Sequence, residues 1–265
     1  APGGCRELAA EARQAGFRHF ISVGGDGTAN EVVNGIFSVN SQDGPALLGV
    51  VPWGTGNDWA TYYGLPSQVD EFINLLRSGN RVQQDIGRVR FGGPRAEREH
   101  YFLNCTGTGF DSYLLARMGS GRGSRWRYLR YVLRSLVSYH ASRLTLELPQ
   151  QQITTSALML EVCLGRYIGA GMHLAPQADA GDGAFEVVLI EELSRWQLLA
   201  SLPYLYNGRI NEHPRVRHLR CDHLEITSAE DQHFQCDGEL IGQLPIKLDI
   251  LQNALRVAAR NTGPG

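Results

Sequence analysis

The chain has 265 residues, of which 43 % are hydrophobic and 20 % charged, and its formal net charge is −2. This length predicts one or two domains, and the composition supports a buried core and excludes a disordered chain. A general nucleic-acid-binding protein would be strongly basic, so the charge argues against that class. Glycine is unusually frequent, at 31 residues, against a usual share of about 7 %.

Cysteine usage and hydropathy indicate the compartment. The five cysteines lie far apart and form no CxxC pair, so we expect buried thiols in a reducing compartment rather than disulfides or a zinc site. No apolar run approaches the ~18 residues of a membrane-spanning helix, and no signal peptide is recognisable, which predicts a cytoplasmic protein. The sequence has no initiating methionine, and we expect it to begin within a longer chain.

The first third of the chain alternates between strand and helix patterns. Helices are expected at 5–15, 28–37 and 69–79, and buried strands at 17–23 and 46–51. Each strand runs into a glycine-rich loop that precedes a helix. This alternation is typical of a parallel sheet covered by helices, whose ligands bind at the carboxyl ends of the strands.

The pattern changes near residue 82, after which most segments resemble strands. Helical patterns recur only at 110–118, 124–140 and 194–207. We therefore predict an α/β domain over residues 1–82 and a largely antiparallel β domain over residues 83–265. The expected strands lie at 83–91, 101–108, 142–149, 153–164, 185–193, 215–228 and 246–260.

The first candidate site is the turn Gly24-Gly25-Asp26-Gly27-Thr28. Glycines allow the backbone to turn with its N–H groups exposed, and the N-terminus of the next helix adds partial positive charge, so the turn suits phosphate. The Asp26 carboxylate fits this place if it meets a metal ion or accepts a proton. The alternative is a tight turn in which Asp26 or Thr28 only caps the helix.

A second glycine-rich loop, Gly54-Thr55-Gly56-Asn57-Asp58, follows the next buried strand. Two such loops at the ends of neighbouring parallel strands would face one crevice, which favours a nucleotide site over two unrelated turns. The alternative is that Asn57 and Asp58 are helix caps. A P-loop is excluded, because the only lysine, Lys247, lies in a C-terminal strand pattern.

The two glycine motifs, GGDGTANEVVNG (24–35) and VPWGTGNDWA (51–60), together resemble the catalytic domain of the diacylglycerol kinase family, which includes sphingosine, ceramide and bacterial soluble lipid kinases. The resemblance implies a phosphofructokinase-like N-terminal α/β domain and a C-terminal antiparallel β-sandwich domain. It also implies ATP and magnesium in the cleft between them. The likeness continues in chain order through residues 85–89, 102–111, 173–190 and 235–257.

The resemblance implies roles for single residues. Asp26 matches an aspartate of the metal and proton network, and Glu239 in the triplet Asp237-Gly238-Glu239 matches the proton acceptor. Transfer of a phosphoryl group to an alcohol needs a carboxylate near the hydroxyl; without the resemblance the triplet would suggest a hairpin turn. The expected nucleotide-binding residues are Gly24, Gly25, Asp26, Gly27, Thr28, Ala29, Asn30, Glu31, Gly54, Thr55, Gly56, Asn57 and Asp58.

A second metal position is implied in the acidic loop that contains Asp179 and Asp182. In similar bacterial lipid kinases, a carboxylate at the position of Asp182 and backbone oxygens at those of Asp179 and Ala184 hold a structural Mg²⁺. The alternative is an acidic loop without metal. The sequence also departs from the family, because the family's N-terminal strand would precede Ala1 and residues 165–171 lack an asparagine often found there.

Residues 117–143 carry seven arginines, no Asp or Glu, and interleaved aromatic residues such as Trp126. This pattern suits docking on an anionic bilayer, and the alternative is an amphipathic helix with a solvated basic face.

Taken together, the sequence predicts a lipid kinase that phosphorylates the hydroxyl of diacylglycerol or a related lipid with ATP. We expect it to be cytoplasmic with peripheral membrane contact, without a nucleic-acid partner, and a homodimer is an open option. Two other readings remain: a kinase of a soluble acceptor such as NAD, and a nucleotide-binding regulatory module without turnover.

Overall fold

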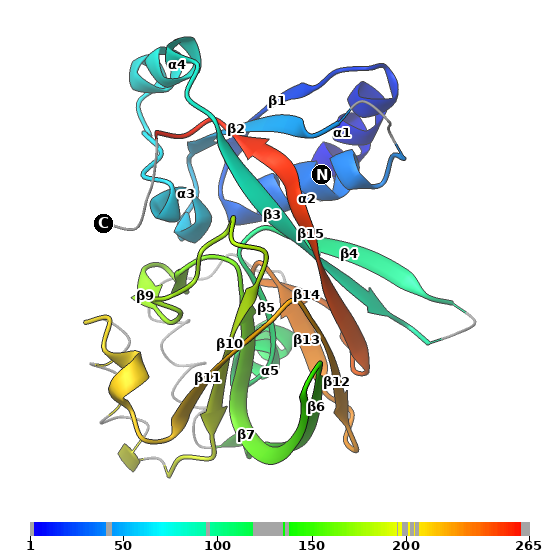
Figure 1. Cartoon of the computed structure of the whole chain (residues 1–265), viewed down its shortest axis with the longest axis vertical. Coiled ribbons are helices and arrows are strands. Elements are labelled where there is room, and N and C mark those ends of the chain that lie inside the picture. The colour runs from blue at the N-terminus through cyan, green and yellow to red at the C-terminus, as the bar shows by residue number, and fades with distance from the viewer. Residues whose placement is uncertain are drawn as a thin grey trace.

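The computed structural model describes residues 3–40, 44–93, 96–118, 135, 138–194, 196–197, 201, 204 and 207–260. Over these ranges the chain forms an N-terminal α/β lobe and a C-terminal β lobe, joined by long strands (Figure 1). The helical patterns at 124–140 and 194–207, and the basic segment 117–143 with its expected membrane contact, lie mostly outside the described residues.

The N-terminal lobe has the predicted alternation of strand and helix. Strands β1 and β2 pair in parallel, with His19 opposite Leu47 and Gly24 opposite Pro52. Helix α2 packs on β1 and against α1, and the approach is so close that a Cβ on Gly35 would lie 2.3 Å from the carbonyl oxygen of Arg6. The elements are α1 (Gly4–Gln14), β1 (His19–Gly24), α2 (Asp26–Phe37), β2 (Ala46–Pro52), α3 (Asp58–Tyr62) and α4 (Val69–Ser78).

The C-terminal lobe is largely antiparallel, as predicted. Its core contains aromatic side chains such as Phe102 and Phe185, whose rings stack with centroids 5.7 Å apart. The elements are β3 (Val82–Phe91), β4 (Arg98–Phe102), β5 (Cys105–Gly109), α5 (Phe110–Met118), β6 (Ser142–Leu148), β7 (Gln151–Cys163), β8 (Tyr167–Ile168), β9 (Met172–His173), β10 (Phe185–Glu191), η1 (Ile210–Glu212), β11 (Val216–Cys221), β12 (His223–Ser228), β13 (His233–Cys236), β14 (Glu239–Gln243) and β15 (Ile246–Val257).

The last strand, β15, belongs to both lobes (Figure 1). It pairs antiparallel with β3 and β12, and residues 255–257 then pair in parallel with β2. Ile246 and Leu248 lie in the C-terminal core, whereas Leu255 and Val257 lie in the N-terminal core. The predicted division at residues 82 and 83 does not provide for this return of the chain.

The cysteines are free thiols, and four of the five are buried, whereas Cys5 is half-buried. Burial raises the pKa of the Cys105, Cys163 and Cys236 thiols well above the usual value, so these groups are neutral core residues. In the part of the chain that the structure describes, no helix combines the length and apolar character needed to span a membrane.

Candidate active site

The two glycine-rich loops meet backbone to backbone at the ends of β1 and β2. A Cβ on Gly54 would lie 2.4 Å from the Gly25 Cα, and one on Gly25 would lie 2.9 Å from the Gly54 Cα. The N–H of Trp53 also donates to the Gly24 carbonyl, at 2.9 Å. Only glycine permits so close an approach, so the structure brings the two predicted loops to one place.

The first loop leads directly into α2. The helix begins at Asp26, and the N–H groups of Thr28 and Ala29 donate to the Gly25 carbonyl at 3.1 and 3.2 Å. The N–H groups in the first turn of a helix carry partial positive charge and lack partners within the helix. The turn and the start of α2 therefore form a backbone arrangement that can bind phosphate.

Asp26 joins the two loops. Its Oδ2 accepts the Asp58 N–H and its Oδ1 accepts the Trp59 N–H, both at 3.2 Å, so Asp26 caps α3. Asn57, which the capping alternative invoked, instead closes its own loop by bonding the N–H and the carbonyl of Gly54, each at 3.0 Å. Each Asp26 oxygen retains a lone pair that can meet a metal-bound water.

Asp58 links the second loop to the C-terminal lobe. Its carboxylate accepts the N–H groups of Ala170 and Gly171, next to β8, at 2.9 and 2.7 Å. Burial raises the pKa of Asp58, and these two donors oppose the rise. The side chain thus joins the lobes, while the neighbouring Thr55 is exposed.

Asp237, the first residue of the DGE triplet, is surrounded by donors. Its two oxygens accept the N–H groups of Leu103, Asn104 and Cys105 at 2.8–3.0 Å, and the Asn30 side chain at 2.7 Å. Burial raises the pKa of this carboxyl, and the four donors lower it. With its lone pairs engaged, Asp237 fixes the triplet to β5 and α2.

Glu239 is the carboxylate that remains available. It lies over the first glycine loop, because a Cβ on Gly27 would be 2.8 Å from Glu239 Oε1. The pKa of Glu239 is raised, first by partial desolvation of the carboxyl group and then by the negative charges of Glu31 and Asp237. A carboxylate with a raised pKa beside a phosphate-binding loop suits a general base.

Three of the residues expected to contact nucleotide direct their side chains into the protein. Ala29 is buried. Asn30 donates to the Tyr101 carbonyl at 3.0 Å as well as to Asp237. Glu31 accepts the N–H groups of Gly3 and Cys5 at 2.9 and 3.1 Å, at the start of α1. These residues lie beside the loop, but their side chains support its position.

His100 belongs to this support, although the sequence suggested no partner for it. Its Nε2 lies 3.2 Å from Asn30 Oδ1 and 3.3 Å from Asn34 Nδ2. Burial lowers the pKa of His100 to about 4, so the ring is neutral at physiological pH. The contact joins β4 to α2, and no local pattern in the sequence could have indicated it.

The acidic loop before β10 lies next to Asp85. Asp182 Oδ2 pairs with Arg220 Nη2 at 2.6 Å and its Oδ1 accepts the Ala184 N–H at 3.1 Å, while Asp179 Oδ1 accepts the Gly181 N–H at 3.1 Å. Among the described residues no three His, Cys, Asp or Glu side chains converge as metal ligands. The predicted site needs only the Asp182 carboxylate and two backbone oxygens, so it stays a prediction, and Mg²⁺ would have to compete with Arg220 for Asp182.

Asp85 is a further residue that the sequence analysis did not single out. Its carboxylate accepts the Asn253 and Gly183 N–H groups, both at 2.7 Å, and so ties β3 to β15 and to the acidic loop. Burial raises the pKa of Asp85, and the nearby charges of Asp182 and Asp179 add to the rise.

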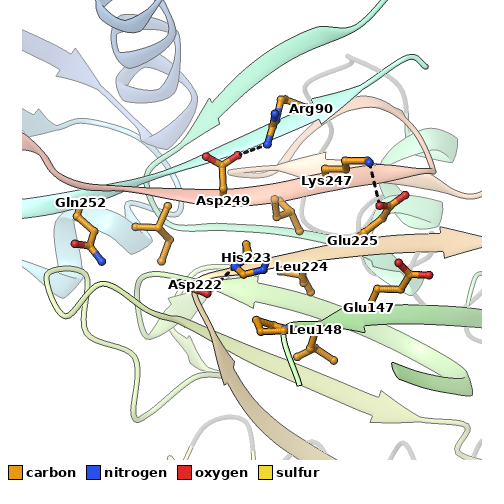
Figure 2. A pocket seen from close by; sticks show the side chains of 13 residues that line it. Arg90, Glu147, Leu148, Asp222, His223, Leu224, Glu225, Lys247, Asp249 and Gln252 are labelled. Carbon is orange, nitrogen blue, oxygen red and sulfur yellow. Dashed lines mark hydrogen bonds and ion pairs between the residues drawn. The ribbon is translucent and has the colours of Figure 1, made fainter. Parts of the chain in front are cut away.

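A cavity of about 590 Å³ lies elsewhere, over the face of β15, β12 and β6, and no residue of the glycine loops lines it (Figure 2). Among its charged side chains, Arg90 pairs with Asp249 at 3.1 Å and Lys247 with Glu225 at 3.2 Å. Asp222 pairs with His223 at 2.8 Å, and Glu147 accepts from the Gln152 amide at 3.2 Å.

Two family models match the chain, one over each lobe. Residues 1–89 match the diacylglycerol kinase catalytic domain, and residues 107–259 match the YegS C-terminal NAD kinase beta sandwich-like domain. The chain belongs to the YegS-like lipid kinases of the diacylglycerol kinase family. The region that matches the catalytic domain contains both glycine loops, and the region that matches the C-terminal domain contains the DGE triplet.

Curated relatives extend over most of the kinase. A protein named "Probable lipid kinase YegS-like" from Yersinia enterocolitica is 28 % identical over 260 residues, which cover 96 % of this chain and 83 % of the relative. A protein of the same name from Yersinia pestis is 28 % identical over 257 residues, with the same coverage.

Solved structures show the same fold. A diacylglycerol kinase from Bacillus anthracis superposes with a TM-score of 0.74 at 19 % identity, covering 98 % of this chain and 82 % of that structure. Yeast NADH kinase gives a TM-score of 0.54 at 12 % identity, covering 92 % and 62 %. These likenesses confirm the combination of an α/β lobe with a β-sandwich lobe in this lipid kinase.

Proposed function

We propose that this lipid kinase transfers the γ-phosphate of ATP to the hydroxyl of diacylglycerol or a related lipid. The observation that carries the proposal is the Glu239 carboxylate, which lies against Gly27 of the phosphate-binding loop. Transfer of a phosphoryl group to a hydroxyl needs a proton acceptor beside the phosphate, and this contact supports Glu239 in that role.

Each part of the site has a separate task in this proposal. The backbone of residues 24–28 and the start of α2 bind the phosphates of ATP, and the close contact of Gly25 with Gly54 shapes the crevice. Asp26 faces this crevice and would hold Mg²⁺ through water. When bound, that ion neutralises charge on the transferring phosphoryl group. Glu239 accepts the hydroxyl proton at a carboxylate oxygen.

A lipid acceptor is favoured by the family, whose curated members carry lipid kinase names. The alternative of a soluble acceptor such as NAD is supported only by a distant likeness in fold to yeast NADH kinase. Contact with a membrane surface through residues 117–143, and a homodimer, stay predictions.

The acceptor class can be tested with radiolabelled ATP and the purified protein. We expect label on diacylglycerol, or on a related lipid, in mixed micelles and none on NAD. Label on NAD alone would overturn the proposal, and so would tight ATP binding without any product, because that result would indicate a regulatory module.

The first prediction concerns the proposed base. Glu239→Gln keeps the size of the side chain but cannot accept the proton, so we expect kcat to fall by about 100-fold or more. ATP affinity should stay near that of the wild type, because the phosphate-binding groups are backbone N–H groups of the other lobe. Glu71→Gln, an exposed change on α4, is the matched control. Unchanged turnover of Glu239→Gln would remove Glu239 from this role.

A further inference from the structure

Two acidic side chains that the proposed chemistry does not use lie together in the C-terminal lobe, and of these residues Glu161 is buried and Asp111 half-buried. Asp111 lies in the first turn of α5, and Glu161 lies on β7 with 0 % exposure. The two carboxyl groups are within hydrogen-bonding reach of each other. Asp111 Oδ1 and Glu161 Oε1 are buried atoms that accept no hydrogen bond from an N–H or O–H donor of the described residues.

The two carboxyl groups avoid mutual repulsion if they share one proton. Two buried carboxylates in contact cannot both be ionised. Burial and the neighbouring Asp111 raise the pKa of Glu161 well above its usual value, while the hydrogen bond from Glu161 partly offsets the rise at Asp111. One proton is therefore shared between the two carboxyl groups. The thiols around the pair, Cys105 and Cys163, are neutral because burial raises their pKa as well.

The chain makes room for Glu161. Gly107 lies opposite it on the neighbouring strand β5, and a Cβ on Gly107 would lie 2.3 Å from the carboxyl atoms of Glu161. A larger residue at position 107 would displace the buried acid. The close fit indicates that Glu161 has a defined position in the lobe.

From that position Glu161 controls a glutamine that contacts the DGE triplet. Gln235 Nε2 donates to Glu161 Oε2 at 3.0 Å, and Gln235 Oε1 accepts the Gly238 N–H at 2.9 Å. A glutamine amide has one donor end and one acceptor end. Because Glu161 offers an acceptor oxygen, the amide must present its oxygen to Gly238.

The triplet needs such support. Asp237 has φ +48° and Gly238 has φ +83°, both in the left-handed region that residues other than glycine occupy rarely. Asp237 is fixed through its own carboxylate. The bond from Gln235 holds the next residue, which directly precedes Glu239.

We propose that Gln235 is a positioning residue for Glu239, and that the buried Glu161 fixes the orientation of the Gln235 amide. This inference rests on the proposed function, because it assigns the support of the proposed base. A merely structural role for the buried groups would change stability. It would not selectively change kcat or the protection of one amide in the triplet.

The first test is Gln235→Met, which keeps the length of the side chain and removes both hydrogen bonds. We expect kcat to fall by about 10- to 100-fold, because small misplacements of catalytic groups have effects of this size, with the KM for ATP unchanged. Hydrogen exchange at the Gly238 amide, followed by NMR, should become faster. Gln243→Met, an exposed change on the adjacent β14, is the control. Wild-type kcat and Gly238 exchange in Gln235→Met would overturn the inference.

The second test compares two changes at position 161. In Glu161→Gln the new amide oxygen accepts from Gln235 and the new NH₂ donates to Asp111 in place of the shared proton, so kcat and Gly238 exchange should stay at wild-type values. Glu161→Leu removes the acceptor, and both measurements should change as in Gln235→Met. A loss of kcat in Glu161→Gln, or its retention in a folded Glu161→Leu, would overturn the role of Glu161. If Glu161→Leu does not fold, a loss of kcat in Glu161→Gln still overturns the role of Glu161.

The two proposals fail in different ways. Exchange at Gly238 is measured without substrate, so it tests the hydrogen-bond chain even if no lipid is phosphorylated. If lipid is phosphorylated and Glu239→Gln abolishes transfer, but Gln235→Met has wild-type kcat, only the inference about Gln235 fails.

Discussion

Four carboxylates converge near the glycine loops, and their hydrogen bonds separate their roles at the scale of single residues. Asp26 caps α3, Asp58 holds a loop of the other lobe, and Asp237 accepts four donors. Donors that bind the charged form oppose protonation. Glu239 has its pKa raised by partial burial and by neighbouring charges, with no donor opposing the rise, which supports it as the proton acceptor.

The pH dependence of transfer should respond to Glu31. Its negative charge contributes to the raised pKa of Glu239, so Glu31→Gln should lower that pKa. A base must be unprotonated to act, and kcat therefore falls as the pH drops through the pKa of Glu239. We expect the acidic limb of the kcat profile, measured from about pH 4 to about pH 8, to move to lower pH in the variant.

The control for this shift is Glu71→Gln, which removes one negative charge from the exposed face of α4. Its acidic limb should coincide with that of the wild type, because a distant exposed charge is screened by solvent and salt. An acidic limb that stays in place in Glu31→Gln, or moves to higher pH, would contradict the expected coupling of the two glutamates.

The role of a residue could be predicted from the sequence only where the residue belongs to a recognisable motif. The meeting of the two glycine loops follows from motif and spacing, whereas the roles of Asp26 and Glu239 rest on the family resemblance and stay predictions. The inward direction of Asn30 follows from neither, because it depends on Asp237, which is 207 residues further along the chain. Helix periodicity places Asn30 on α2 but cannot reveal which strand will cover it.

At the scale of elements, helices and strands with strong hydrophobic periodicity could be predicted from the sequence, whereas short elements could not. The predicted helix at 69–79 agrees with α4 (Val69–Ser78), and the strand at 46–51 agrees with β2. Helix α3 was missed, because its 5 residues offer too little pattern and its cap is Asp26, 32 positions earlier. Thus the element depends on a contact between the two loops that only the folded chain provides.

That contact can be tested with Gly54→Ala. The added Cβ would lie 2.4 Å from the Gly25 Cα and 2.7 Å from Asn57 Oδ1, so the loops must separate. Overpacking of this kind costs about 1–3 kcal/mol, and the crevice should bind a non-hydrolysable ATP analogue about 5- to 100-fold more weakly in calorimetry. Gly4→Ala, with no atom within 4 Å of the new Cβ, is the control. Unchanged affinity in Gly54→Ala would show that the contact does not shape the crevice.

At the scale of the whole molecule, β15 makes the two lobes one structure. Residues 246–260 could be predicted as a strand, yet not as the neighbour of β2, which precedes them by some two hundred residues. Parallel pairing across such a separation leaves no local signal, since any buried strand would satisfy the pattern. The strand carries side chains of both cores, so unfolding of either lobe removes support from the other.

This coupling predicts the response to Leu255→Ala. Leu255 has 0 % exposure and lies in the N-terminal core, so its truncation should lower the free energy of unfolding by about 2–5 kcal/mol. Because β15 continues into the C-terminal core, we expect one calorimetric transition that shifts as a whole, with faster hydrogen exchange in both lobes. Leu8→Ala, at a side chain that is 68 % exposed, should change stability by no more than about 0.5 kcal/mol. Two separate transitions, of which only the first responds to Leu255→Ala, would mean that β15 joins the lobes in space without coupling their stability.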